Sequence, residues 1–535
     1  METTFLAIEP SLTEVSIEDN LEQFLIVLSV SLSVATISRI FSWFRQIPYT
    51  LLLVIVGLGL AFVDIRLVSL SPELILEIFL PPLLFEAAWN TRWRSLQNSL
   101  IPVSLFAIFG VVISVVGVAF PLSYFTNMSL ATALLVAASL SSTDPVSVVA
   151  LLRELGASKR LTILMEGESL FNDGVAVVAF LLLVNIPLGI GEFDISTIMI
   201  RFITFVGIGF SIGGLIGFAI SYLTQRFDLP LVEQSLTLVS AYGTYLITEE
   251  LGGSGVIGVV IAGIILGNFG SRVGMNPRTR LLVSEFWDFL AFFVNSIVFL
   301  LIGDQINFSS LKSNFGLIVM AIAFVSFTRA IMIFGLGNIS NLFSQTKTNL
   351  REQTVLWWGG LRGSVSIALA LSVPEVLASR QEIIDTVFGV VLFSLLVQGL
   401  SMKWLLSTLD LLVGDQPLRQ EYSELLARKV AMKRVLKYLN NNELASEIDP
   451  EYYRYQQELV KGELESIKDK MGSMQKKYEN LRSLTIEQLN EQMLDIEADT
   501  YAEFIRAGKL NENLSSVLQD IIAKAGDTES IGGEN

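Results

Sequence analysis

Long apolar stretches dominate this sequence and restrict the folds it can adopt. A helix needs about 20 mostly apolar residues to cross a bilayer, and we count thirteen candidate stretches. They are residues 23–43, 48–64, 73–89, 100–125, 129–152, 167–187, 196–224, 231–248, 254–270, 283–303, 315–336, 353–374 and 384–408. The third is the weakest, because Pro81 and Pro82 interrupt it. The sequence therefore predicts an all-α polytopic membrane protein with thirteen transmembrane helices.

Charged side chains are unevenly spread along the chain. Only 16% of the 535 residues are charged, below the roughly 25% of a soluble protein, and the mean hydropathy is +0.59. Residues 1–408 hold 48 charged side chains, whereas the much shorter segment 409–535 holds 40. The first 20 residues lack the basic region of a signal peptide, so we expect the first apolar stretch to be retained. We predict an extracellular segment 1–22, a transmembrane domain 23–408, a charged helical cytoplasmic tail 409–525 and a disordered C-terminus 526–535.

Lysine and arginine residues in the loops indicate how the spans are oriented. Basic residues concentrate in cytoplasmic loops, and the two alternating sets of loops carry 13 and 4 of them. A wrong number of spans would disturb this alternation. We therefore expect a multi-pass protein of the cell (plasma) membrane, with its N-terminus outside and its tail in the cytoplasm. The basic set is Arg39, Arg45, Arg92, Arg94, Arg153, Lys159, Arg160, Arg226, Arg272, Arg278, Arg280, Lys347 and Arg351.

Residue types that are missing exclude several classes of function. The chain has no Cys and no His, so disulfides, thiol chemistry and zinc sites are excluded, and proton chemistry near neutrality must use carboxylates or Lys. The net charge of −16 is unlike that of a nucleic-acid binder. No phosphate-binding loop, kinase signature or zinc motif occurs. We predict that the chain is not an enzyme, needs no cofactor and has no nucleic-acid partner.

Six ionisable residues stand out inside the predicted spans. A charge there is costly and usually faces a pathway or a partner. The set holds four acids and two bases, so acid remains in excess after internal pairing. A spare buried carboxylate is what a cation site needs. The six residues are Glu86, Asp144, Glu168, Asp173, Arg329 and Arg362.

Two spans are expected to break near their middle. In the fifth span Pro145 follows the polar residues 141–144, and proline removes an amide donor and clashes with the preceding turn. In the twelfth, three glycines within residues 359–363 weaken the helix around Arg362. As fifth members of two inverted six-helix repeats, these spans would cross at the midplane, with Asp144 near positive and Arg362 near negative half-helix ends. The alternative is a pair of ordinary kinks with satisfied backbone groups.

The sixth span opens with a group of polar residues. Ser169 and Asp173 are four residues apart and share a helix face. Glu168 is rotated about 140° away from Asp173 by the helical period, so we expect it to pair with an arginine on another helix. Asn172 places an uncharged amide beside the acid. Asp173 is then either a transport site or a structural acid hydrogen-bonded to its neighbours.

Five motifs occur in order within residues 20–408. They read LPPLLFEAAW, SSTDPVSVVALLRELG, EGESLFNDGVAVV, FWDFLAFFVNSIVFLLIG and GGLRGSVSIALALS. With these motifs the chain resembles the sodium/proton antiporters of the cation:proton antiporter-1 family, the NhaP and eukaryotic sodium/proton exchanger group. The resemblance implies an NhaA-type antiporter fold and a homodimer with separate dimerisation and core domains. The tail carries no motif of this kind.

The resemblance also implies roles for individual residues. Asp173 would bind the cation or the proton, while Asn172 and Thr143 would order the site. Ser169 and Glu86 match positions that contribute to the ion shell in prokaryotic members. The remaining matches are structural: Glu168 pairs with Arg329 on the eleventh span, and Asp144 and Arg362 are the charges at the helix crossing.

A mechanism follows from this reading. Sodium prefers oxygen ligands, and Asp173, Ser169, Thr143, a freed carbonyl and water supply them. A proton and a cation compete for one carboxylate, and the bare charge should not cross the membrane, so the two fluxes are coupled. One acid beside an asparagine predicts electroneutral exchange of one Na⁺ for one H⁺. Potassium/proton exchange, mixed sodium, lithium and potassium exchange, a passive cation channel and a membrane-bound sensor stay as alternatives.

The tail contains a basic amphipathic stretch at residues 421–439. Such a helix can lie along anionic lipid, or it can be solvated and packed on the membrane domain. Its basic residues are Arg428, Lys429, Lys433, Arg434 and Lys437.

Overall fold

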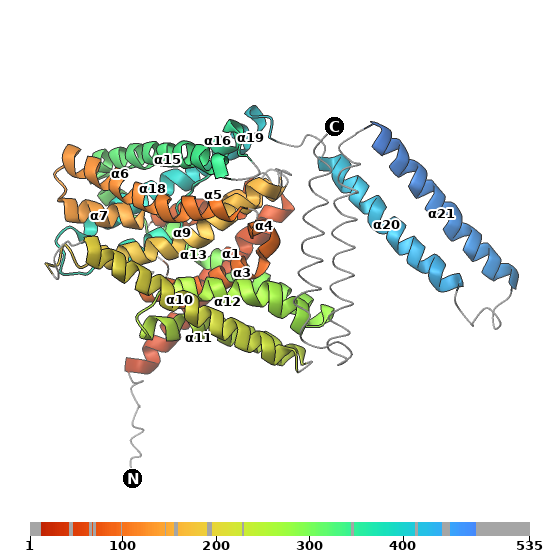
Figure 1. Cartoon of the computed structure of the whole chain (residues 1–535). Coiled ribbons are helices and arrows are strands. Elements are labelled where there is room, and N and C mark those ends of the chain that lie inside the picture. Colours follow the sequence, from red (N-terminus) through yellow and green to blue (C-terminus); the bar gives the residue numbers. More distant parts are fainter. Residues whose placement is uncertain are drawn as a thin grey trace, which may run out of the picture. The chain divides into compact units, whose positions relative to one another are not determined.

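The described part of the computed structural model is entirely helical (Figure 1). It divides into two compact units, Met1–Leu412 and Val413–Asn535. The expectations for residues 1–11, for Pro145 and for residues 478–535, including the disordered C-terminus, lie outside the described residues. The structure describes residues 12–41, 47–63, 67, 71–97, 99–144, 146–154, 159–189, 195–226, 229–343, 347–411, 416–440 and 450–477.

Each of the thirteen predicted stretches contains a helix in the first unit. In chain order the unit holds α1 (Leu12–Ile40), α2 (Tyr49–Phe62), η2 (Leu74–Phe79), α3 (Leu80–Asn90), α4 (Trp93–Gln97), α5 (Leu100–Ser104), η3 (Leu105–Phe109), α6 (Gly110–Phe125), α7 (Leu130–Ser139), α8 (Val146–Glu154), α9 (Lys159–Leu183), α10 (Ile195–Thr224), α11 (Pro230–Glu250), α12 (Gly255–Ile265), η4 (Leu266–Gly274), α13 (Pro277–Asp304), α14 (Phe308–Ser313), α15 (Phe315–Phe343), α16 (Leu350–Trp358), α17 (Ser364–Leu371), α18 (Arg380–Phe393), η5 (Ser394–Gly399) and α19 (Leu400–Thr408).

Length and apolar composition alone identify five membrane-spanning helices in the described residues. Several other predicted spans are shorter or carry acidic residues, and two are divided: α7 and α8 share one stretch, α16 and α17 another. The protein is therefore embedded in a membrane, whereas the number of spans does not follow from composition. The five helices are Leu100–Phe125, Ser196–Thr224, Thr279–Asp304, Phe315–Phe343 and Arg380–Thr408.

Some helix boundaries differ from those predicted by hydropathy. Helix α9 begins at Lys159 rather than at residue 167, because its first turns carry polar residues that a search for apolar runs excludes. Helix α13 begins at Pro277, since Asn276 caps it by accepting a hydrogen bond from the Thr279 amide at 2.8 Å. Hydropathy detects the apolar middle of a helix and not its capped end.

The two prolines of the third predicted span do not end its helix. Pro81 and Pro82 occupy the first turn of α3, which continues directly from the π-helical segment η2. A proline removes an amide donor and clashes with the preceding turn. The wider π-helical turn accommodates this disturbance, so the expected interruption becomes a local change of helix type.

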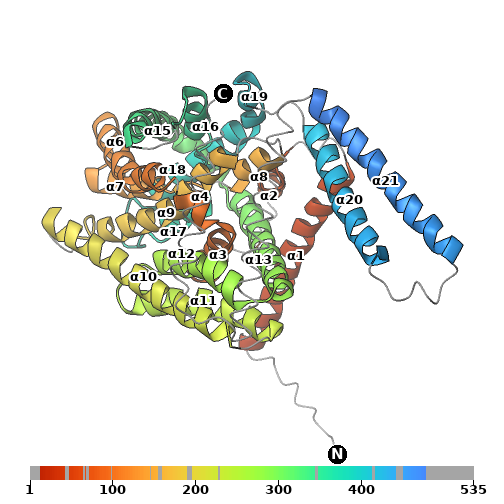
Figure 2. The ribbon, with the colours of Figure 1, turned by 45° about the vertical axis from the view of Figure 1, so that its right-hand side comes forward.

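Two groups of helices form the first unit (Figures 1 and 2). In one group α10, α11 and α12 pack on one another, α12 packs on α3, and α13 packs on α2 and α3. In the other group α6 packs on α7 and α15, and α18 packs on α15 and α17. Helix α9 contacts both groups, through α7 on one side and α10 and α12 on the other. The residues predicted to carry the chemistry of the sixth span therefore lie where the groups meet.

Glycines allow α2 and α13 to approach at backbone distance. A Cβ added at Gly57 would collide with the Leu300 carbonyl oxygen, and one added at Gly303 would collide with that of Val54. Gly59, two residues along α2, has no atom within 4 Å of such a position. Small residues at helix crossings are the usual means of close packing in membranes.

We expect Gly57→Ala to lower the free energy of unfolding by about 1–3 kcal/mol, because the added methyl group overpacks this crossing. Gly59→Ala is the matched control in the same helix and should leave stability unchanged or slightly raised. Thermal unfolding of the purified protein in detergent measures both. Equal unfolding temperatures for the two variants would contradict the close approach of α2 and α13.

The second unit contains a helical hairpin of α20 (Gln416–Asn440) and α21 (Pro450–Lys477). Two ion pairs join these helices, Arg428 with Glu463 and Lys470 with Glu421, the latter at 2.7 Å. The apolar side of the predicted basic helix thus packs on α21, a partner that neither sequence-based alternative included. Its small core consists of Tyr422, Ile467, Met471 and Met474, with Leu425, Leu426 and Met432 packed against them.

Candidate functional site

Two interrupted helices meet at their breaks in the first unit. Helix α7 ends at Ser139 and α8 begins at Val146, while α16 ends at Trp358 and α17 begins at Ser364. The stretches between them are joined by a backbone hydrogen bond from the Asp144 amide to the Leu361 carbonyl at 2.8 Å. In both spans one helix therefore ends and a second helix begins after the break. This interruption is more extensive than the ordinary kinks that the sequence left as the alternative.

Arg362 satisfies the carbonyl groups released where α7 ends. Its Nη1 donates to the carbonyl oxygens of Ser141 at 2.9 Å and Ser142 at 2.8 Å. Its backbone amide donates to Ser394 Oγ at 3.0 Å, and the residue is 2% exposed. A cation beside carbonyls that lack intrahelical partners is favourable. The guanidinium thus replaces the hydrogen bonds that the broken helix has lost.

Asp144 occupies the opposite position, at the start of α8. Its Oδ1 accepts a hydrogen bond from the Val146 amide at 2.9 Å. A carboxylate at a helix N-terminus is stabilised by the unpaired amide groups there. Gly363 lies directly against this carboxylate, and a Cβ at that position would collide with it. The glycine is needed for this close approach between the two breaks.

Asp173 lies on α9 beside the first break and is 9% exposed. Ser142 Oγ donates to its Oδ1 at 2.5 Å. Asn172 Nδ2 donates to Thr143 Oγ1 at 3.2 Å, and Ser169 Oγ donates to the Thr143 carbonyl. The Asn172 Oδ1 atom is buried and has no hydrogen-bond partner among the described residues. The acid thus lies in a small polar group assembled from α9 and the break of α7.

The carbonyl groups released by the break have donors within the protein. Those of Ser141 and Ser142 accept from Arg362, and that of Thr143 accepts from Ser169. We expected a freed carbonyl to be available as a cation ligand. A carbonyl oxygen has two lone pairs, so these groups keep acceptor capacity, but none of the three is without a partner.

Glu168 and Arg329 form a buried bidentate ion pair. Arg329 Nη1 and Nη2 donate to the two carboxylate oxygens at 3.0 and 3.2 Å. Arg329 also donates to the carbonyls of Leu356 at 3.0 Å and Trp357 at 3.2 Å, at the end of α16. Glu168 is 2% and Arg329 is 4% exposed. The pair connects α9, α15 and α16, and it lies on the side of α9 to which the helical period assigned Glu168.

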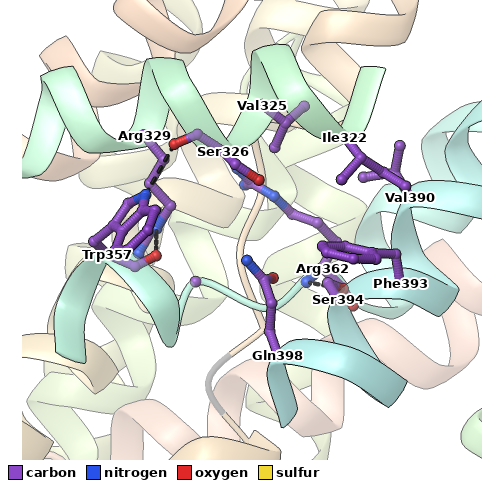
Figure 3. Close-up of a pocket in the computed structure, with 11 residues that line it drawn as sticks. Ile322, Val325, Ser326, Arg329, Trp357, Arg362, Val390, Phe393, Ser394 and Gln398 are labelled. Carbon is purple, nitrogen blue, oxygen red and sulfur yellow. Dashed lines mark hydrogen bonds between the residues drawn. The ribbon is translucent and has the colours of Figure 1, made fainter. Parts of the chain in front are cut away.

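Both buried arginines line one small pocket (Figure 3). Arg329 enters it from α15, and Arg362 enters it from the break between α16 and α17. Ser326, Ser394 and Gln398 add polar groups to its wall. The pocket therefore presents two guanidinium groups, one of them paired with Glu168, and does not suit a cation.

Glu86 belongs to a different set of contacts. Its Oε1 accepts from Asn90 Nδ2 at 2.6 Å, one turn further along α3. The same amide group donates to Asp288 Oδ1 on α13 at 3.1 Å. These contacts join α3 to α13. They do not place Glu86 among the ligands of a cation.

Sequence reasoning omitted several residues of the site. Ser142 was noted only as part of a polar stretch, although its hydroxyl contacts Asp173 directly. Ser394 and the Leu361 carbonyl, which bind the backbone of the two breaks, carried no signal. The position of Ser142 directly beside a predicted break could have suggested a role in the site. Partners from distant spans, such as Ser394 and Leu361, follow only from the three-dimensional structure.

Comparisons with known proteins agree with this architecture. The chain is 66% identical over 520 residues to the Na(+)/H(+) antiporter ApNhaP of Aphanothece halophytica, covering 97% of this chain and 100% of that protein. It is 62% identical over 507 residues to the low-affinity Na(+)/H(+) antiporter NhaS1 of Synechocystis sp., covering 94% and 96%. The fold matches the sodium proton antiporter MjNhaP1 from Methanocaldococcus jannaschii at pH 8, with a TM-score of 0.59 and 21% identity over 72% of this chain and 99% of that one.

The family match and these two relatives define a membrane-embedded transporter and not an enzyme. The model of the sodium/hydrogen exchanger family, transmembrane, matches residues 29–408, which is more than half of the chain. The chain belongs to this family.

We expect Glu168→Ala to lower the free energy of unfolding by about 3–5 kcal/mol, because it leaves the Arg329 guanidinium buried and unpaired. The double variant Glu168→Leu/Arg329→Met removes both charges and should recover much of this loss. Thermal unfolding in detergent compares the two. A double variant that is no more stable than the single one would contradict the importance of the unpaired charge.

Proposed function

We propose that the protein is an electroneutral Na⁺/H⁺ antiporter in which Asp173 binds Na⁺ or H⁺ in competition. The observation that carries this proposal is a charge balance. Around the two breaks, the bases Arg329 and Arg362 are matched in number by Glu168 and Asp144, which leaves Asp173 as the acid in excess there. That acid lies at the meeting point of two interrupted helices, where transporters of this architecture bind ions.

The relatives support the choice of ions. Two curated proteins that match this chain over 94% or more of its length are named Na(+)/H(+) antiporters. On this basis we assign Na⁺ and H⁺ as the transported substrates.

The oxygen atoms around Asp173 form the proposed cation site. Its carboxylate would be joined by the lone pairs of the Ser169 and Thr143 hydroxyls and by the unpartnered Asn172 amide oxygen. Helix α3 packs against α9 and carries Glu86 as a further candidate oxygen donor. Water completes the shell of a hard cation. The protein supplies only oxygen ligands here, as such a cation requires.

The coupling of the Na⁺ and H⁺ fluxes arises from the free-energy cost of moving a carboxylate that binds neither ion. An ionised carboxylate that moves through the membrane without a counter-charge is strongly disfavoured. Asp173 loaded with Na⁺ or H⁺ is neutral, so the loaded states move and the empty state does not. Since one carboxylate carries one charge in each half-cycle, the exchange is one for one and electroneutral.

The observed helices would be arranged as in an inverted-repeat transporter. Thirteen spans would comprise two inverted six-helix repeats and one linking helix, in an NhaA-type fold. The group of α10, α11 and α12 would form the dimerisation domain of a homodimer, and the group of α6, α7, α15 and α18 the moving core. The N-terminal segment 1–22 would lie outside the plasma membrane, the transmembrane domain would comprise residues 23–408, and the tail 409–525, whose described helices are α20 and α21, would lie in the cytoplasm.

Asp173→Asn should abolish Na⁺-dependent proton exchange in proteoliposomes while leaving folding intact. The neutral amide provides no negative charge to balance Na⁺ and no carboxylate to take up H⁺. Asp385→Asn is the matched control. Asp385 is also buried in the membrane domain, but its oxygens accept from Ser310, Asn314 and Gln381, each at 2.8 Å, so it has a structural role. The control should retain exchange. Normal exchange by Asp173→Asn would refute the assignment.

Electroneutral exchange should be independent of membrane potential. In proteoliposomes with an imposed potential of either sign, the initial rate of Na⁺-driven proton movement should not change, and it should saturate with Na⁺. The same assay with Li⁺ and K⁺ ranks the ions. A rate that depends on voltage would exclude the one-for-one stoichiometry, and flux without saturation would instead indicate a passive channel.

A further inference from the structure

The hydroxyl group of Ser142 is the only side-chain hydrogen-bond partner of Asp173 among the described residues. We infer that Ser142 is a positioning residue that sets the competition between Na⁺ and H⁺, by donating to the ionised carboxylate and accepting from the protonated one. This inference rests on the proposed function of Asp173. It extends that function by assigning ion competition to a residue of the first break to which the family resemblance gave no role.

The geometry fixes Ser142 firmly against the acid. Its Oγ lies 2.5 Å from Asp173 Oδ1, which is a short hydrogen bond of the kind formed with a charged acceptor. The residue is 2% exposed, so water does not replace it readily. Its own carbonyl accepts from Arg362 Nη1 at 2.8 Å. The backbone of Ser142 is thereby held at the crossing, and its hydroxyl is directed at one oxygen of the carboxylate.

A hydroxyl group suits both loaded states of Asp173. It can rotate, and it can act as a donor or as an acceptor. Towards the ionised carboxylate it donates, and this hydrogen bond leaves Oδ2 and the unpartnered Asn172 oxygen for the cation. Towards the protonated acid it accepts, so the neutral state keeps a partner as well. A hydrogen bond to a charged group is stronger than one between neutral groups. The serine therefore stabilises the ionised carboxylate, which binds Na⁺, more than it stabilises the protonated acid.

Removal of this hydroxyl should therefore favour the proton. We expect Ser142→Ala to raise the apparent KM for Na⁺ about tenfold, which corresponds to about 1.4 kcal/mol. The pH of half-maximal exchange should move about one unit towards alkaline values, because a tenfold change in the competition equals one pH unit. The maximal rate at saturating Na⁺ and alkaline pH should change little.

Two variants accompany this measurement in proteoliposomes. Ser142→Thr keeps a hydroxyl and should restore the KM and the pH profile to a large extent. Ser139→Ala removes a serine hydroxyl that is equally buried at the end of α7 and has no hydrogen-bond partner among the described residues. It should leave both quantities unchanged. This control separates a loss of the Asp173 contact from a general effect of removing a buried hydroxyl.

The outcomes distinguish the inference from the proposed function. A wild-type KM and pH profile in Ser142→Ala would overturn the inference and leave Asp173 as the carrier. Equal changes in Ser139→Ala would also overturn it. Exchange that survives in Asp173→Asn would instead remove the proposed function. If Ser142→Ala does not fold, Ser142→Thr and Ser142→Cys provide the comparison, since the thiol is a weak donor and should give the same direction of change.

Discussion

The arrangement of this membrane domain depends on the hydrogen bonds that replace those of two broken helices. Unpaired backbone groups in the interior of a membrane protein are strongly disfavoured. Here Arg362 donates to two carbonyls at the end of α7, and the Asp144 amide donates to Leu361 across the crossing. Both interruptions are thereby stabilised by groups from the other helix. Neither break is satisfied alone, so the crossing forms as one unit.

The sequence predicted the positions of the two breaks because their causes are local. Proline and clustered glycines disfavour a helix wherever they occur. Buried charges such as Glu168 and Arg329 could be predicted to have partners on physical grounds, since an isolated charge in a membrane is costly. The particular pairing came from a family resemblance. The direct contact of Ser142 with Asp173 was not predicted, because it depends on how α9 is rotated against α7.

Other features escaped prediction for a different reason. Hydropathy located the apolar middle of α9 and α13 but not their polar first turns, of which that of α13 is capped by Asn276. The partner of α20 in the tail is the next helix, α21, whose paired residues such as Glu463 and Arg428 are 35 positions apart, and the core between the helices involves ordinary Leu, Ile and Met side chains. Patterns within one segment contain no information about which distant segment completes its surface.

The ion pair between Glu168 and Arg329 has a mechanical consequence. Arg329 holds the carbonyl end of α16 and, through Glu168, the middle of α9. Asp173 is only five residues further along α9 and is itself attached to the break of α7 through Ser142. A displacement of any one of these helices must displace the others. These side chains therefore couple α9, α15, α16 and the break of α7 into one mechanical unit, and rotation of a single side chain does not separate them.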